Sequence, residues 1–258
     1  MRRSILILAS LTALAAAMDG YFVEPYRIEV TQSTVEAQIA APLKIAHLSD
    51  LHTTGFGRRE RKLLDLLEQE KPDVIIITGD TLGHGEHYEP VRLLLSKFHA
   101  PLGVWFVLGN WENGRPISNE HAFYSGVGIH LLVNEGSSIR PDVWLAGLDD
   151  PASSEPNFDA AVANAPQGAY VIAALHAPGY FDTIAGRVPL VLAGHAHGGQ
   201  VRLPPIPAFW LPKECGRYLE GWYEERGSLM YVSRGIGTSI LPIRFLCRPE
   251  LAIITLHP

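Results

Sequence analysis

The sequence predicts a single α/β domain with a mixed β-sheet, arranged in two or four layers. Short apolar runs of strand length alternate with amphipathic segments of helical period. The chain has 258 residues, of which 47% are hydrophobic, so it can bury a sizeable core and is not expected to be disordered. Because no internal repeat or low-complexity tract divides it, one domain is favoured over two.

The apolar runs define the order of the elements. Val74–Thr78 is a continuous β-branched run, as in a strand that is covered on both faces. Further strands are predicted at Leu43–Leu48, Val104–Leu108, Val143–Ala146, Tyr170–Leu175, Leu190–Ala193, Leu229–Ser233 and Leu251–Leu256. Helices are predicted at Arg58–Gln69, Val91–Phe98 and Phe158–Asn164.

An apolar segment opens the chain. Arg2 and Arg3 precede residues 4–18, which carry no charge and are mostly Ile, Leu and Ala, the pattern of a basic n-region and an apolar h-region. This run is shorter than the roughly twenty residues that span a bilayer, and Ala15–Ala17 offers a cleavage pattern, so a cleaved signal peptide is the first interpretation. An uncleaved anchor extended through residues 21–23 is the second, and a buried first helix is the third.

The predicted organisation is therefore a signal peptide or membrane anchor at 1–18, a lead-in strand or linker at 19–42, and a folded domain at 43–258. Both leading interpretations keep the arginine pair inside the cytoplasm and place the domain outside it. In such an oxidising compartment Cys215 and Cys247 could form a disulfide.

The overall charge and the cysteine count exclude some classes of function. The formal net charge of −6 gives no reason to expect nucleic-acid binding. Two cysteines are too few for a disulfide scaffold or a cysteine-type zinc site.

Five polar clusters each follow a predicted strand. Their members are Asp50 and His52, Asp80, Asn110, His176, and His195 with His197. Taken singly, an Asp at a strand end is often a turn or capping residue, and a lone His is often a surface or core residue. Taken together, they form a mixed nitrogen and oxygen set that suits Mn, Fe or Zn. Seven ligands exceed one tetrahedral site and suit two ions with a shared carboxylate, as in phosphoester hydrolysis.

The order of these clusters, D-x-H, G-D, G-N-x-E, H and G-H-x-H, resembles the calcineurin-like metallophosphoesterases. The resemblance runs from Leu43 to the C-terminus. It extends to bacterial membrane-associated members with a short N-terminal leader through residues 194–200 and 231–238. It implies a four-layer αββα sandwich with mixed sheets. The leader predicts a location at the bacterial inner membrane, on its periplasmic face.

The resemblance also implies roles for the seven residues. It assigns Asp50, His52 and His197 to one divalent ion and Asn110, His176 and His195 to the second, with Asp80 bridging both. Such ions polarise phosphoryl oxygens and lower the pKa of a bound water. Asp80 and Asn110 would be the catalytic residues, with Asn110 also donating to a phosphoryl oxygen. The implied enzyme is a metal-dependent hydrolase of phosphoric esters or anhydrides.

One position departs from the family pattern. Many members have His directly after the motif Asn, where it helps to protonate the leaving group, but this chain has Trp111. Indole has no titratable proton near neutral pH. Either the substrate has a good leaving group, or His84 or His87 supplies the proton, or activity is weak or lost. We therefore predict a preference for phosphodiester, phosphoanhydride or aryl phosphate bonds over alkyl phosphomonoesters. Trp111 itself either packs over the pocket or stacks on a base or sugar of the substrate.

Three further segments have two interpretations each. The Pro-rich apolar loop at 203–212 precedes basic residues, so it either contacts an anionic membrane or an acyl chain, or packs over the sheet edge. The segment 233–238 either holds a phosphate through backbone N–H groups and Arg234, or is an ordinary turn. Asp150 either forms a turn or orients a histidine.

The sequence as a whole predicts a two-metal phosphoesterase that acts near a membrane on a phosphorylated small molecule or lipid. A UDP-2,3-diacylglucosamine pyrophosphatase-type enzyme is an alternative that suits Trp111. An exported domain disagrees with that alternative, because UDP-sugars are cytosolic. A third interpretation is a catalytically weak metal-binding interaction module.

Overall fold

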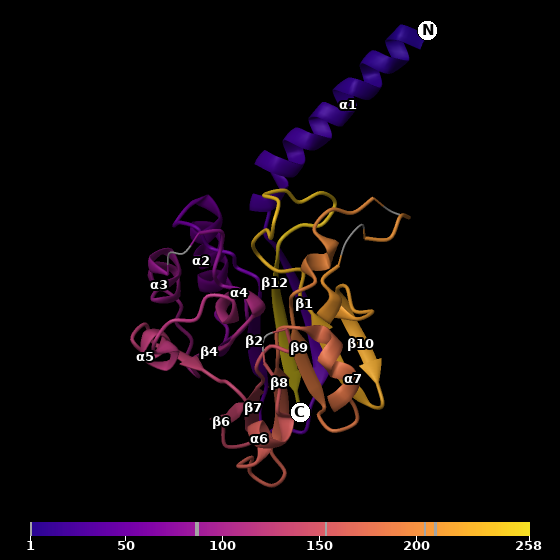
Figure 1. Ribbon diagram of the computed structural model, residues 1–258. Coiled ribbons are helices and arrows are strands. Elements are labelled where there is room, and N and C mark those ends of the chain that lie inside the picture. Colours follow the sequence, from indigo (N-terminus) through magenta and orange to yellow (C-terminus); the bar gives the residue numbers. More distant parts are fainter. Residues whose placement is uncertain (1, 86–87, 153, 204, 209–210) are drawn as a thin grey trace.

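Two six-stranded sheets pack face to face, with helices on the outer face of each (Figure 1). This computed structural model describes residues 2–85, 88–152, 154–203, 205–208 and 211–258. The arrangement confirms the predicted four-layer α/β sandwich with two mixed sheets.

The first sheet is parallel except for one pairing. Its strands, in spatial order, are β1 (Glu29–Glu36), β12 (Glu250–His257), β2 (Leu43–Leu48), β3 (Val74–Thr78), β4 (Val104–Val107) and β5 (Ile129–Leu131). Only the β12–β2 pair is antiparallel among these described strands. β1 pairs with β12 along its whole length, so residues 29–36 of the lead-in segment form a strand, whereas residues 19–22 of it are helical.

The second sheet has a parallel centre and an antiparallel strand at each edge. Its strands, in spatial order, are β10 (Gly221–Glu225), β11 (Ser228–Val232), β9 (Leu190–Ala193), β8 (Tyr170–Ala174), β7 (Val143–Gly147) and β6 (Glu135–Arg140). β10 and β6 are the antiparallel edge strands. Neither was expected from the sequence, and nor was β5, because these short, partly polar strands lack a continuous apolar run.

Helices lie on both sides of the sandwich, and one further helix, α1 (Arg2–Phe22), lies outside it. The others are α2 (Arg58–Glu70), α3 (Glu89–Leu95), α4 (Asn110–Asn113), α5 (Glu120–Ser125), α6 (Phe158–Val162) and α7 (Phe181–Ile184). Short 3₁₀ turns occupy Glu24–Tyr26, Pro178–Tyr180, His197–Gly199 and Lys213–Cys215. α3 begins two residues before the predicted helix because Pro90 fits the first turn, and it ends three residues earlier, at Leu95.

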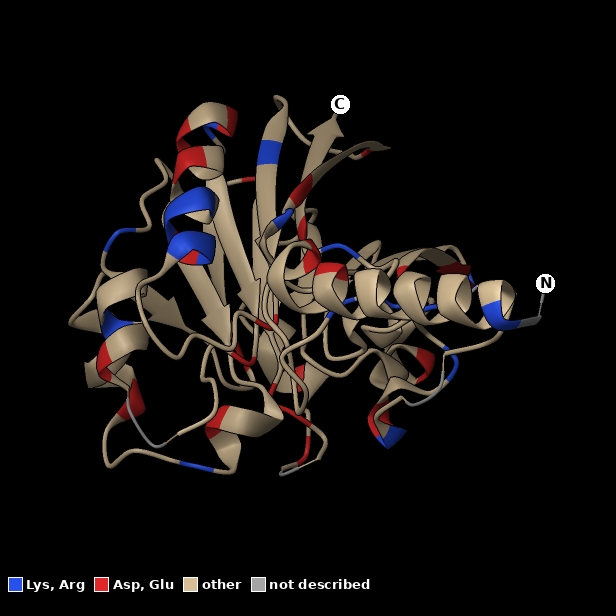
Figure 2. Cartoon of the chain, turned by 90° about the horizontal axis from the view of Figure 1, so that it is seen from above, with Lys and Arg blue, Asp and Glu red and all other residues tan. Residues whose placement is uncertain are grey.

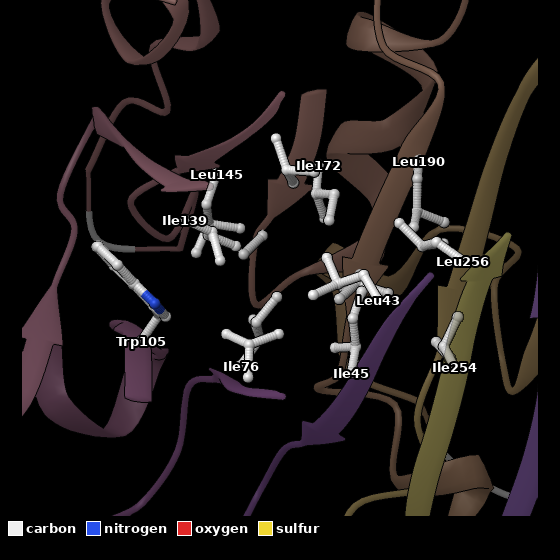
Figure 3. Packing of buried hydrophobic residues seen from close by; sticks show 14 of the residues in the cluster. Leu43, Ile45, Ile76, Trp105, Ile139, Leu145, Ile172, Leu190, Ile254 and Leu256 are labelled. Carbon is white, nitrogen blue, oxygen red and sulfur yellow. The ribbon is translucent and has the colours of Figure 1, made fainter. Parts of the chain in front are cut away.

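The central core fills the space between the two sheets. Leu43 and Ile45 of β2 point into it, together with Ile76 of β3, and they face Leu145 and Ile172 of the second sheet (Figure 3). Intervening residues of the same strands point to the outer face, where α2 and α3 cover them. Each such fully buried aliphatic side chain stabilises the fold by about 1.5–3 kcal/mol relative to exposure. The sandwich is therefore a rigid base for the loops at its strand ends.

α1 projects away from this sandwich (Figure 1). Its apolar side chains are exposed, as Leu8 at 67% illustrates, so the buried-helix interpretation of the N-terminus is wrong. The segment Arg3–Tyr26 is long and apolar enough to cross a membrane, a test that a signal sequence near an N-terminus also passes. Seen from above, α1 carries basic residues only at its outer end (Figure 2).

Candidate metal centre

The seven residues predicted as ligands come together at one edge of the sandwich. They follow β2, β3, β4, β8 and β9, whose carboxyl ends meet there because these neighbouring strands run parallel. Two groups have ligand atoms close enough to hold one ion each: Asp50, His52 and His197, and Asp80, His176 and His195. All six side chains are buried, and Asn110 is half-buried beside them.

The backbone at these positions is strained. Five of the seven residues have φ in the left-handed region: Asp50 (51°), His52 (42°), Asp80 (54°), His195 (68°) and His197 (52°). Residues other than glycine rarely adopt this conformation, which costs on the order of 1–3 kcal/mol each. The loops after β2 and β3 brace each other, since the backbone N–H groups of Asp50 and His52 donate to the carbonyls of Gly79 (3.0 Å) and Asp80 (3.0 Å).

The first group converges on the Nε2 atom of His197. Asp50 Oδ1 lies 3.2 Å from this atom, and so does His52 Nε2. The His52 ring is oriented by its other nitrogen, because Nδ1–H donates to the Leu82 carbonyl at 2.9 Å. Nε2 of His52 is therefore the unprotonated nitrogen and presents its lone pair to the group.

The second group is built on His176 in the same way. Its Nδ1–H donates to the Thr78 carbonyl at 2.8 Å, which turns Nε2 toward the centre. That Nε2 lies 2.9 Å from Nδ1 of His195 and 3.1 Å from Oδ1 of Asn110. Nitrogen and oxygen acceptors thus face one another without enough protons to pair them all.

Asp80 lies between the two groups. One carboxylate oxygen, Oδ1, accepts the backbone N–H of Trp111 at 2.9 Å and is fixed by it. The other, Oδ2, is 3.6 Å from Nε2 of His52 and 3.4 Å from Nε2 of His176. A single oxygen thus faces both groups.

Burial and mutual charge determine the protonation of the centre. Burial lowers the pKa of His52 to about 4 and that of His195 to about 3, so both are neutral at physiological pH. Burial would raise the pKa of Asp80, but the charge of His176 outweighs it and lowers that pKa to about 2. Burial would lower the pKa of His176, but the charge of Asp80 outweighs it and raises that pKa well above its usual value. Burial also raises the pKa of Asp50 to about 6. A bound cation would displace the extra proton of His176, because metal ions bind neutral imidazoles and ionised carboxylates.

Several buried polar atoms of the centre have no hydrogen-bond partner within the described residues. They are Oδ1 of Asp50, Nε2 of His195 and Nδ1 of His197. Buried polar atoms in native proteins are nearly always paired, so unpaired ones require an explanation. Of these atoms, Oδ1 of Asp50 faces the first group, so a cation there would bind it beside Nε2 of His197. The mixed imidazole and carboxylate set fits a divalent metal.

Glu112 is a structural residue of the centre to which sequence reasoning assigned no role. Its buried carboxylate accepts the backbone N–H groups of Asp80 (2.9 Å), Thr81 (2.8 Å), Leu82 (3.0 Å) and Gly109 (3.0 Å), and the Thr81 hydroxyl (2.8 Å). It thereby ties the loop after β3 to the loop after β4. The G-N-x-E spacing carried the signal, since a Glu at the third helical position caps its own helix.

Trp111 lies over the first group. Its ring is edge-on to His52, with centroids 4.6 Å apart, and edge-on to His84 at 5.0 Å. His84 and His52 both line a neighbouring polar pocket. His87, the other proposed source of a proton, lies outside the described residues.

The structure corrects the expectation for Arg234. Its guanidinium pairs with Glu29 (2.8 Å) and Glu250 (3.3 Å), and its backbone N–H donates to Glu250 at 3.0 Å. The turn that contains it uses its N–H groups to brace the Asp50 loop, with Gly237 donating to the Asp50 carbonyl. The segment is therefore described as a structural turn, in which the backbone N–H and one guanidinium nitrogen of Arg234 already bind carboxylates.

The structure also places the two cysteines and Asp150. Cys215 and Cys247 are both buried free thiols in the described part of the chain, so no disulfide joins them there. Asp150 is buried; its Oδ2 accepts the backbone N–H of Ala152 at 3.0 Å, as in a turn, and its Oδ1 has no hydrogen-bond partner among the described residues. Of the loop at 203–212, residues 204, 209 and 210 lie outside the described residues.

Lys213 also contributes to the site. It lines the cavity above the centre, whose volume is about 290 Å³ and whose floor includes Asp80, Asn110 and His195. Its neighbour Glu214 approaches Nε2 of His195 to 3.7 Å. The sequence indicated only that the residues after the loop at 203–212 are basic and did not place Lys213 in the site.

Six buried residues that could hold metal ions, with the half-buried Asn110 beside them, lie at strand ends of a two-sheet sandwich, which is the arrangement of a metal-dependent hydrolase. Residues 43–199 match the sequence profile of the calcineurin-like phosphoesterase family, and the chain belongs to this family. It is therefore a metal-dependent phosphoester hydrolase whose site is suited to divalent ions.

Individual relatives agree with this assignment. The chain is 30% identical to the uncharacterized metallophosphoesterase YkuE of Bacillus subtilis, over 92% of this chain and 89% of that protein. It is 27% identical to phosphodiesterase YaeI of Escherichia coli, over 99% and 98%. A solved 5'-nucleotidase precursor from Thermus thermophilus shares the fold with a TM-score of 0.50 at 15% identity. That match covers 76% of this chain and 49% of that one.

Proposed function

We propose that the chain is a dinuclear phosphodiesterase or phosphoanhydride hydrolase that acts on a membrane-proximal or lipid-linked substrate. The observation that carries this proposal is Oδ2 of Asp80, which faces both buried groups at once. In this proposal Asp50, His52 and His197 hold one divalent ion, and His176, His195 and Asn110 hold the second. Mn, Fe and Zn all suit this donor set.

Ions held in this way would polarise the phosphoryl oxygens and make a water more acidic. The protein's own groups supply position and charge. The Trp111 N–H fixes one carboxylate oxygen of Asp80, so the other oxygen keeps its position between the two groups. Asn110 lines the cavity with its Oδ1 at 3.1 Å from Nε2 of His176, and its amide N–H₂ would donate to a phosphoryl oxygen. Lys213 adds a positive charge on the same cavity wall.

Trp111 limits the bonds that this site would cleave. It shields His52 and leaves the position next to Asn110 without a proton donor of suitable pKa. Bonds whose leaving group departs without full protonation are therefore the proposed substrates, as in aryl esters, diesters and anhydrides. His84, packed against the indole, is the described residue that could move a proton there.

In this proposal α1 is not cleaved and holds the domain at the membrane. Its last turn is joined to the domain, since the backbone N–H of Arg244 donates to the Gly20 carbonyl at 2.9 Å. Just beyond α1, the buried Glu24 carboxylate accepts the Cys247 N–H. A fusion of the intact N-terminus to a reporter active only in the periplasm should be active. An inactive reporter would favour the cytosolic UDP-sugar alternative.

The test of activity is turnover of a phosphoester panel with Mn, Fe or Zn. The panel contains bis(4-nitrophenyl) phosphate, a diphosphate, glycerol phosphate and a phospholipid. We expect fast cleavage of the aryl diester and slow cleavage of glycerol phosphate. Asp80→Ala should abolish turnover, whereas Asp65→Ala, at an exposed position on α2, should not. Equal turnover by Asp80→Ala and the intact chain would remove the two-metal mechanism, and equal rates on glycerol phosphate and the diester would contradict the leaving-group argument.

A further inference from the structure

An apolar pocket adjoins the metal centre. It has a volume of about 320 Å³ and is lined by Ala196, Gly199, Val201, Ile240 and Leu241, with His197 at one wall. Its size falls in the range of small-molecule sites, which are mostly apolar with a few polar groups. The pocket thus begins at a proposed metal ligand and leads away from it.

The pocket communicates with the cavity above the metal centre. His197, Ser239 and Ile240 line both spaces, so the two share a boundary. A phosphoryl group placed over Asp80 and Asn110 would have one substituent directed along this boundary. The position is therefore that of a substrate subsite.

Hydrogen bonds hold the wall of the pocket in place. The Gln200 amide donates to the carbonyls of Ser239 (3.1 Å) and Leu241 (2.9 Å), and its oxygen accepts the Ser239 N–H at 2.8 Å. The Gln200 carbonyl accepts the Phe245 N–H at 3.0 Å. The loop 239–245 is thereby attached to the turn that carries His197, so the pocket is formed before any ligand binds.

The same loop is attached to the base of α1. Arg244 contacts Gly20 through the backbone hydrogen bond described above, and Figure 1 shows the loops of this region directly below α1. Here Ile240 (59%), Leu241 (57%) and Leu246 (59%) expose most of their side chains. An apolar rim at the foot of an exposed apolar helix would contact the surface of the membrane that holds the helix.

A polar pocket borders the centre on the side of His52. It has a volume of about 730 Å³, and Arg58, Arg59, His84 and Thr238 are among its lining residues. The metal centre therefore has an apolar space beside His197 and a polar space beside His52. A substrate with a hydrocarbon chain on one side of its phosphoryl group and a polar group on the other would match both.

We propose that the apolar pocket binds the hydrocarbon chain of a lipid phosphoester whose phosphoryl group lies at the metal centre. This inference rests on the proposed function and names its substrate class. The chain would enter from the membrane along the exposed rim of the pocket. Burial of apolar surface would then favour long-chain substrates, by roughly fourfold in affinity for each methylene that is fully buried.

The test compares ethyl and decyl 4-nitrophenyl phosphate, which share a leaving group and differ only in the chain. The full-length protein is held in phosphatidylcholine vesicles with Mn²⁺, and kcat/KM is measured for each diester. We expect a decyl-to-ethyl ratio of at least ~10, since a few methylenes suffice for that gain. Leu241→Asn should reduce the ratio severalfold. The control Leu93→Asn, an exposed leucine on α3, should keep it.

Partition of the decyl chain into the vesicles affects all variants equally, so the difference between Leu241→Asn and Leu93→Asn isolates the pocket. A ratio near one in the wild type, or an unchanged ratio in Leu241→Asn, would overturn the inference. If the wild type cleaves neither diester, the proposed function fails. Calorimetry with decylphosphonate and ethylphosphonate then tests whether the pocket binds a hydrocarbon chain. Tighter binding of decylphosphonate that is lost in Leu241→Asn would still support the inference. Equal binding of the two phosphonates would refute it.

Discussion

Replacing Glu112 by Gln tests whether one carboxylate holds the metal-site loops together. In the wild type, Oε1 of Glu112 accepts two backbone N–H groups and the Thr81 hydroxyl, and Oε2 accepts the N–H groups of Asp80 and Gly109. An amide has a single oxygen, so at least two buried N–H donors would face an NH₂ group. Each buried donor left unpaired costs about 1–3 kcal/mol, so Glu112→Gln should lower the free energy of unfolding by about 2–6 kcal/mol.

The assay is equilibrium unfolding in urea, with a chelator present so that metal binding does not contribute. Glu68→Gln, at an exposed position on α2, is the matched control and should unfold within about 0.5 kcal/mol of the wild type. The variant should also lose metal affinity, because the loop that bears Asp80 is no longer tied to Gly109. A Glu112→Gln protein as stable as the control would refute the argument.

Three other substitutions test the close packing at Gly194, the neutral state of buried His47 and the missing proton donor at Trp111. A methyl group at Gly194 would overlap the Ser49 hydroxyl and come within 2.6 Å of Asp50 Oδ2. Gly194→Ala should therefore weaken Mn²⁺ binding at least ~10-fold by calorimetry, while Gly55→Ala, which has free space, should not. Burial lowers the pKa of His47 from 6.5 to about 3, so the folded state binds fewer protons and the wild type loses stability as pH falls below 6.5. His47→Gln should remove up to about 1.4 kcal/mol per pH unit of that slope between pH 6.5 and 4.5 in urea titrations, and an unchanged slope would argue against a neutral buried ring. Trp111→His should raise the rate on glycerol phosphate relative to the aryl diester by ~10² or more, and a constant ratio would mean that the missing acid does not limit cleavage.

Continuous apolar patterns made the interior of the fold predictable. β3 runs from Val74 to Thr78 as expected, because every residue in it is buried and every residue is β-branched. β6 and β10 could not be found in this way. They lie at sheet edges, where one side of the strand is free and polar residues are tolerated, so their sequences show no clear period.

The metal centre was predictable for a different reason. Its candidate ligands are chemically distinctive and follow apolar runs, so their positions at neighbouring strand ends follow from the parallel order. The part played by Glu112 depends on two loops meeting in space, which residue spacing does not show. Arg234 illustrates the converse. Its partners Glu29 and Glu250 come from β1 and β12, and only the pairing of those strands brings them to it.

The apolar pocket was also beyond sequence reasoning. The sequence drew attention to the apolar loop at 203–212, whereas the pocket is formed by residues 239–241 and the turn after His197. That loop carries only a short apolar stretch, and it becomes a pocket wall through its hydrogen bonds to Gln200.

The number of Mn²⁺ ions bound per chain at saturation distinguishes a centre of two ions from a centre of one. Equilibrium dialysis followed by elemental analysis should give two ions for the intact protein. It should give one for Asp50→Ala, because Asp50 belongs to only one of the two groups. A single ion in the intact protein, or two ions in Asp50→Ala, would contradict a dinuclear centre built on Asp80.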